Sequence, residues 1–138
     1  YCATVPREGQ KSTWIVSEMI EAYIRLHDEG YAHSVEVYKE GELVGGLYGI
    51  AYGKAFFGES MFSLVPDASK IAFKALSDVL VSKGYDFIDC QMKTDHMIRL
   101  GAEVVERDFF LNALEAAIEK PTDSGSWQHF NWEYEDGK

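Results

Sequence analysis

Apolar side chains recur at helical spacing near the start of the chain. In segment 17–30 the apolar positions are Met19, Ile20, Tyr23, Ile24 and Leu26. They mostly follow the i, i+3, i+4 pattern of one helix face. Ser17 can cap such a helix at its start, and Gly30 can end it. We therefore expect a helix over this segment.

Three strand-like runs follow directly, over residues 32–40, 42–53 and 55–62. They are separated only by Gly41–Glu42 and by Tyr52–Gly53–Lys54. Separators this short are typical of β-hairpins. The pattern therefore predicts an antiparallel meander.

The second half of the chain alternates between helical and strand patterns. Pro66 and Asp67 mark a turn into a helix that ends at Gly84. The expected elements after it are a strand over 87–91 placed centrally in the sheet, a short helix over 94–102, a weak strand over 103–107 and a helix beginning at Asp108. Residues 119–138 are predicted to form an irregular tail. The order predicts one α+β domain over 1–118, with a mixed sheet flanked by helices. This order resembles the N-acetyltransferase-like acyltransferase fold.

Two acidic positions and an amide lie on strands that are otherwise apolar. Asp89 and Gln91 share one face of strand 87–91, about 6–7 Å apart if the strand is regular. A carboxylate and an amide at that distance could hold an amine, and a carboxylate could take its proton. Glu59 follows aromatic residues, where it could bind a positive amine. The plainer interpretation makes Asp89 a structural hydrogen-bond acceptor and Glu59 a solvent-exposed residue.

The cysteines and histidines do not form a pattern typical of nucleophilic catalysis or metal binding. Cys90 points to the strand face opposite Asp89, so a pairing of Cys90 with His96 is a poor nucleophilic site. The other histidines lack metal-ligand spacing, and we expect no metal. Two cysteines, Cys2 and Cys90, form no disulfide framework and suit the reducing cytoplasm.

The charge and the apolar content limit the partners. The 138 residues carry a net charge of −10, which argues against a broad basic surface for nucleic acid. The chain contains no run of about 18 apolar residues, so we expect no membrane span. Acyl-CoA enzymes of this fold need a glycine-rich turn that binds pyrophosphate at a helix start. Here that junction, 60–70, reads SMFSLVPDASK and has an acid and no glycine. We therefore expect no coenzyme A.

A run of motifs resembles the bacterial leucyl/phenylalanyl-tRNA–protein transferases. In order along the chain it reads TWI, HSVEVY, LVGGLYGIAYG, FFGESMFS, ASK, IDCQ, DH and LGA. The resemblance covers residues from about Thr13 to Leu111. It implies an enzyme that moves leucine or phenylalanine from aminoacyl-tRNA to the N-terminal Arg or Lys of a protein, which marks that protein for degradation.

The resemblance also implies roles for particular residues. Asp89 and Gln91 match the family's catalytic pair, either as a proton relay or with the aspartate holding substrate. Residues that match its substrate-binding positions are Glu59, Phe56, Met61, Ile88 and Trp14. From the residues alone, Phe56 and Met61 fit a core better than a pocket. Thr94 and Arg99 depart from the family pattern, so the peptide preference could differ.

The family has an N-terminal domain and a basic segment ahead of the region where this chain begins. We expect the RNA-binding lysines and arginines to lie in that part. The expectation is thus a cytoplasmic, monomeric catalytic portion with aminoacyl-tRNA as co-substrate and no cofactor. Two alternatives stay open: a non-catalytic module that recognises basic protein N-termini, and an acyltransferase that uses another activated donor.

Overall fold

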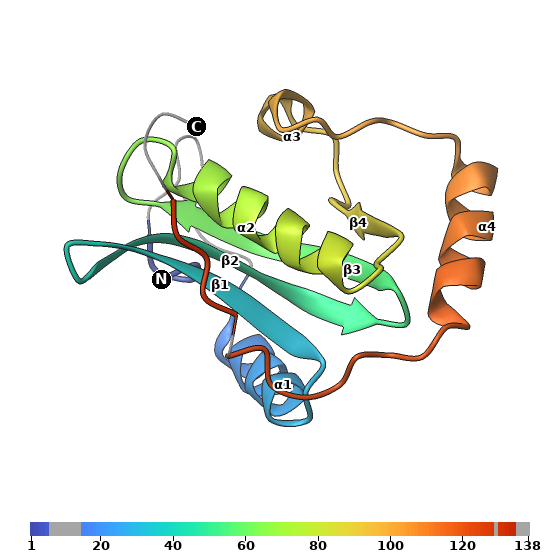
Figure 1. Cartoon of the computed structure of the whole chain (residues 1–138), viewed down its shortest axis with the longest axis horizontal. Helices are drawn as coiled ribbons and strands as arrows, with labels where there is room; N and C mark the ends of the chain where they lie inside the picture. Colours follow the sequence, from blue (N-terminus) through green and yellow to red (C-terminus); the bar gives the residue numbers. More distant parts are fainter. Residues whose placement is uncertain (6–14, 129, 135–138) are drawn as a thin grey trace.

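A computed structural model describes residues 1–5, 15–128 and 130–134 of the chain. The helices are α1 (Ser17–Asp28), α2 (Ala68–Ser82), α3 (Asp95–Arg99) and α4 (Arg107–Ile118). The strands are β1 (Ala32–Lys39), β2 (Glu42–Tyr52), β3 (Ala55–Ser63) and β4 (Phe87–Asp89). The predicted helix–meander–helix–strand order is therefore confirmed over the first two-thirds of the chain (Figure 1).

The strands form one mixed sheet in the order β1-β2-β3-β4. β1, β2 and β3 are antiparallel neighbours, and β4 runs parallel to β3. The β1–β2 turn places Glu40 and Gly41 at φ values of 52° and 83°. Positive φ at both central residues is the turn geometry that best matches the twist of a hairpin. The predicted meander and the α+β class with a mixed sheet flanked by helices are both confirmed.

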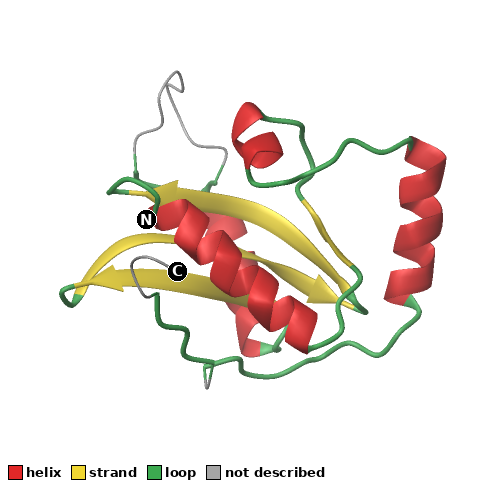
Figure 2. Ribbon diagram, turned by 45° about the horizontal axis from the view of Figure 1, so that its top comes forward, coloured by secondary structure: helices red, strands yellow, loops and turns green. Residues whose placement is uncertain are grey.

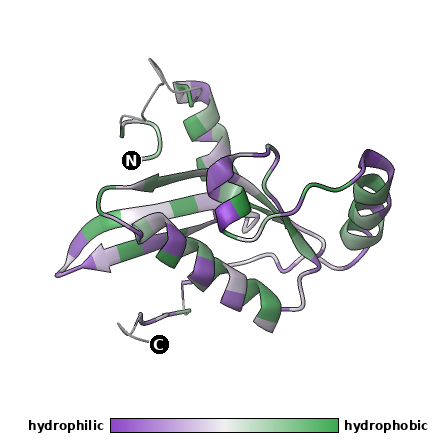
Figure 3. Cartoon of the chain, turned by 90° about the horizontal axis from the view of Figure 1, so that it is seen from above, coloured by the Kyte–Doolittle hydropathy of each residue, from purple (hydrophilic) through white to green (hydrophobic). Residues whose placement is uncertain are grey.

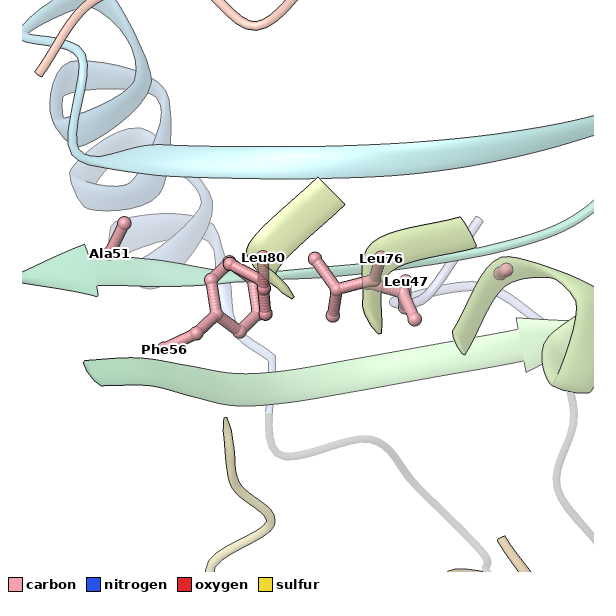
Figure 4. Close-up of a cluster of buried hydrophobic side chains, with 6 residues drawn as sticks. Leu47, Ala51, Phe56, Leu76 and Leu80 are labelled. Carbon is pink, nitrogen blue, oxygen red and sulfur yellow. The ribbon is translucent and has the colours of Figure 1, made fainter. Parts of the chain in front are cut away.

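Helices cover both faces of the sheet, as Figures 2 and 3 show for α1 and α2. The buried residues of α2 are Ala68, Ser69, Ala72, Ala75, Leu76 and Leu80, which recur at helical spacing. Several of them are small, so α2 lies close to β2. The main core sits between α2 and the sheet and contains Leu47, Ala51 and Phe56 from the strands (Figure 4). The main core therefore lies on the α2 face of the sheet, and α1 covers the other face.

Three local predictions were wrong. β4 ends at Asp89 and lies at the edge of the sheet rather than at its centre. Residues 103–106 form no strand because Val104 and Val105 are exposed and no described strand pairs with them. Ser17 is the first residue of α1 rather than its cap, and the cap position is Val16.

The described residues after α4 form no helix or strand, and they contact several elements of the fold. We call residues 120–134, apart from residue 129, the C-terminal strap. Trp127 of the strap stacks on His33 of β1, with ring centroids 3.8 Å apart. Lys54 Nζ donates to Asp123 at 2.9 Å, and Trp132 Nε1 donates to Asp78 of α2 at 2.9 Å. The strap therefore joins α4, β1 and α2, which are distant along the chain.

Within the described ranges, no helix has both the length and the apolar character that crossing a bilayer requires.

Candidate active site

Glu59 lies where the pairing of β2 and β3 changes register. Tyr48 pairs with Ser60 and Gly49 pairs with Gly58, which leaves Glu59 as an extra residue on β3. A bulge of this kind redirects a side chain relative to a regular strand. Met61 packs against the core on the α2 face, whereas Glu59 reaches a residue of α1 on the other face. The bulge is therefore what turns Glu59 away from the core.

Asp89 and Gln91 are brought together by a turn, not by strand alternation. Gln91 has a φ of 62°, and its backbone N–H donates to Asp89 Oδ1 at 2.7 Å. Aspartate commonly closes a turn by accepting from the residue two positions later. The predicted proximity holds, but the predicted reason for it was wrong, because the strand ends before Gln91.

The three predicted polar residues form one hydrogen-bonded group. Gln91 Nε2 donates to Gly58 O at 2.9 Å and to Glu59 Oε1 at 3.2 Å. Both partners are acceptors only, so the amide nitrogen must face them. Oε1 is then the group that Gln91 can offer to an amine. The site thus combines two carboxylates with one oriented amide.

Tyr23 of α1 completes this group and was missed in the sequence, where it counted only as an apolar helix position. Its hydroxyl donates to Glu59 Oε2 at 2.7 Å, and its ring makes an edge contact with Tyr48. Burial and the hydrogen bond to the Glu59 carboxylate raise the pKa of Tyr23 above its usual value, so the hydroxyl stays protonated. A tyrosine on an amphipathic helix carries no sequence signal for such a role.

The described apolar residues that were predicted to bind substrate all lie in or against the main core. Phe56 is fully buried in the main core, and Met61 packs against the same cluster. Ile88 also packs there, but it lines a groove as well. Trp14 lies outside the described residues. A pocket-lining role for these residues stays a prediction.

A large groove begins at the polar group. It has a volume of about 1150 Å³ and is bounded by residues 86–93 on one side and by α3, the following loop and α4 on the other. Ile88, Asp89 and Gln91 are part of its wall. We call it the β4–α4 groove. Because Ile88 packs on the core, Asp89 next to it points to the opposite sheet face, the one covered by α1.

Cys90 is a poor nucleophile here. Burial and then the neighbouring Asp89 charge raise the pKa of its thiol, which disfavours the thiolate. Both cysteines are free. Over the part of the chain that the structure covers, no three His, Cys, Asp or Glu side chains are grouped so that they could hold a metal ion.

Comparison with known proteins now adds to this geometry. The sequence model of the leucyl/phenylalanyl-tRNA protein transferase family matches residues 1–115. The chain belongs to this family. It is 55% identical to the leucyl/phenylalanyl-tRNA–protein transferase of Myxococcus xanthus over 126 residues, 91% of this chain and 54% of that protein. It is 53% identical to that of Maridesulfovibrio salexigens over 135 residues, 97% of this chain and 56% of that protein.

This chain therefore spans about half the length of the curated family members that it matches. Among solved structures, an aminoglycoside acetyltransferase from an uncultured soil metagenomic sample, in complex with trehalose, is similar with a TM-score of 0.45 and 15% sequence identity. That similarity covers 93% of this chain and 80% of the acetyltransferase.

Proposed function

We propose that this chain carries the acceptor-amine site of a leucyl/phenylalanyl-tRNA–protein transferase. The reaction would move leucine or phenylalanine from its tRNA ester to the α-amino group of an N-terminal Arg or Lys. The observation that supports it best is the pair of carboxylates, Glu59 and Asp89, joined through Gln91 at the start of a groove. Two carboxylates and an amide oxygen suit an ammonium group.

For this reaction the protein needs to position the amine against the ester carbonyl and to supply one proton acceptor. The amine nitrogen attacks the ester carbonyl, a C–N bond forms, and the C–O bond to the ribose breaks. An α-amino group has a reference pKa near 8, so it must lose a proton before attack. In this proposal Asp89, held by the Gln91 N–H, receives that proton, and the ribose oxygen takes one as it leaves. The activated ester supplies the driving force, so no cofactor is needed.

The net charge of −10 bears on the tRNA partner. A surface of this charge repels phosphate, so we propose that this chain contacts only the aminoacylated end of the tRNA. The main tRNA-binding surface would then lie in the half of the relatives' length that this chain does not span. The same negative charge also favours a second candidate, a module that binds basic protein N-termini without transfer.

Transfer of labelled leucine from Leu-tRNA to a peptide beginning with Arg tests the proposal. We expect transfer by a chain lengthened to the full size of the relatives, and a loss of about 10²- to 10⁴-fold in its Asp89→Asn variant because the proton acceptor is removed. Asp95→Asn, in the first turn of α3, is the matched control and should leave the rate unchanged. This chain alone, tested beside it, should bind tRNA weakly.

The two candidates give different results. If the lengthened chain binds the Arg peptide but transfers nothing, the protein is a recognition module and the transferase proposal fails. Equal transfer by Asp89→Asn and the parent would remove Asp89 from the chemistry.

A further inference from the structure

Several apolar side chains in the wall of the β4–α4 groove are exposed to solvent. Val104 is 69% exposed and Phe109 is 65% exposed, and both line it. Figure 3 shows apolar colouring along α4, which stands apart from the sheet. Other exposed apolar residues of the groove wall are Met92, Ile98 and Val105. Apolar side chains that are exposed together in one groove are a common feature of binding sites.

The groove also exposes one edge of a strand. β4 is the last strand of the described sheet, and its backbone pairs with β3 on one side only. The other side faces the groove, since residues 86–93 form its wall. An open edge can receive an extended chain through backbone hydrogen bonds.

The groove is continuous with the polar group, and this fixes the direction of any bound chain. β4 ends at Asp89. A polypeptide whose free amine sits at Asp89 and which lies along β4 must run antiparallel to it, back toward Phe87. In an antiparallel pair the hydrogen bonds lie perpendicular to the strands, and successive side chains of the added chain alternate between the two faces of the sheet.

The size and charge of the groove fit a polypeptide. Small-molecule pockets span about 300–1,000 Å³, and this groove exceeds that range at about 1150 Å³. Its charged residues have both signs, and Lys120 is already paired with Asp86 at 2.6 Å. Because the charges of the wall are balanced, no single charge would select the residues beyond the first, and the apolar side chains and the edge of β4 are the features left to do so.

From these observations we propose that the β4–α4 groove binds the acceptor polypeptide beyond its N-terminal residue, as an added strand antiparallel to β4, with a preference for apolar side chains at its second to fourth positions. The inference rests on the proposed function for the identity of its ligand. It adds a subsite and a sequence preference for the acceptor, which is an extended, unfolded N-terminus.

Peptide binding by this chain tests the inference without tRNA. The probes are Arg-Val-Phe-Val and Arg-Ser-Gly-Ser, each with the same C-terminal fluorophore, measured by fluorescence anisotropy. We expect the apolar peptide to bind at least about tenfold more tightly, since it buries apolar side chains in the groove. Val104→Asp and Phe109→Asp should remove that advantage and leave the polar peptide unaffected.

Val81→Asp on α2 is the matched control, because Val81 is 77% exposed and lies outside the groove. It should change neither affinity. N-methylation of the peptide amide at the second or the third residue tests strand addition, because only one of the two should point at β4 and weaken binding. Circular dichroism of each variant checks the fold.

Three results would overturn the inference: equal affinity for the two peptides, no binding of either, or groove variants that change only self-association. The last would mean that the apolar surface packs against protein rather than substrate. If the lengthened chain transfers no leucine while this chain keeps its preference for the apolar peptide, the proposed function fails and the groove remains a peptide-binding surface.

Discussion

The Tyr23 hydroxyl on α1 donates to the Glu59 carboxylate on β3, and one substitution can remove this hydroxyl alone. Tyr23→Phe keeps the ring contact with Tyr48 and deletes only the hydrogen bond to Glu59. A hydrogen bond to a charged group contributes about 1.5–3 kcal/mol. We expect leucine transfer by the lengthened chain to fall about tenfold, because Glu59 and Gln91 lose their fixed orientation. Tyr38→Phe, an exposed tyrosine on β1, is the control and should have no effect.

His33 should make the fold sensitive to acid. It is 4% exposed, stacks under Trp127, and its Nε2 finds no partner among the described residues. Burial lowers the pKa of His33 to about 4, and the His27 and Lys83 charges act in the same direction, while its backbone hydrogen bond with Gly30 opposes them. The unfolded chain, with a pKa near 6.5, then binds the proton more readily.

Stability from His33 is therefore present above pH 6.5 and is lost as the pH falls toward 4. The loss is about 3 kcal/mol, since each unit of pKa shift corresponds to about 1.4 kcal/mol. Urea unfolding between pH 7 and pH 4 measures it. His33→Phe should flatten this part of the profile, whereas His96→Gln on α3 should not. An unchanged slope in His33→Phe would mean that other groups cause the acid sensitivity.

At the scale of elements, the β2–β3 turn contacts the end of α4 and helps to position it, beside the ring contact between Phe87 of β4 and Phe110 of α4. Lys54 N–H of the β2–β3 turn donates to Ala117 O of α4 at 2.9 Å, and Gly53 N–H of the same turn donates to Thr122 Oγ1 of the C-terminal strap at 2.8 Å. Gly53 has a φ of 57°, and a Cβ there would lie 2.2 Å from Ala117 O. The backbone of α4 leaves no room for any side chain at this position.

Gly53→Ala should therefore destabilise the protein more than positive φ alone explains. Gly41→Ala is the matched control, since Gly41 has a φ of 83° and nothing within 4 Å of the added Cβ. Both variants cost about 1–2 kcal/mol in left-handed strain. The clash at Gly53 should add about 1–3 kcal/mol, measured as the free energy of unfolding in urea. Equal losses of unfolding free energy in the two variants would show that α4 can shift to accommodate the added Cβ without cost.

At the scale of the whole molecule, the C-terminal strap completes the core although it lies beyond the part that matches the family model. Trp127 packs against the main core, and Lys83 and Tyr85 also contact its ring. Trp127→Ala should lower the free energy of unfolding by about 3 kcal/mol, as for other large aromatic truncations. Gln128→Ala, at the exposed neighbouring position, should change it by less than about 0.5 kcal/mol. Similar effects of the two would mean that the strap is not part of the folding unit.

Local patterns predicted the elements that fold through local contacts. The periodicity of α1 and α2 and the short turns of the meander were sufficient, because neighbouring residues decide them. Two of the three errors lie where partners are distant along the chain, and the third, the cap of α1, is off by one position. Residues 103–106 read as a strand but have no described neighbour to pair with, and β4 read as central but has a neighbour on one side only.

The sequence by itself determined the α+β class, the meander, the family and the three polar residues Glu59, Asp89 and Gln91. The tertiary structure alone decided how they meet. A bulge turns Glu59 from the core, a turn folds Gln91 onto Asp89, and Tyr23 arrives from a helix 36 residues away from Glu59. Periodicity reports which face a residue takes in a regular element. It cannot report where an element breaks or which distant group satisfies a buried polar atom, because those depend on contacts that form only when the chain is packed.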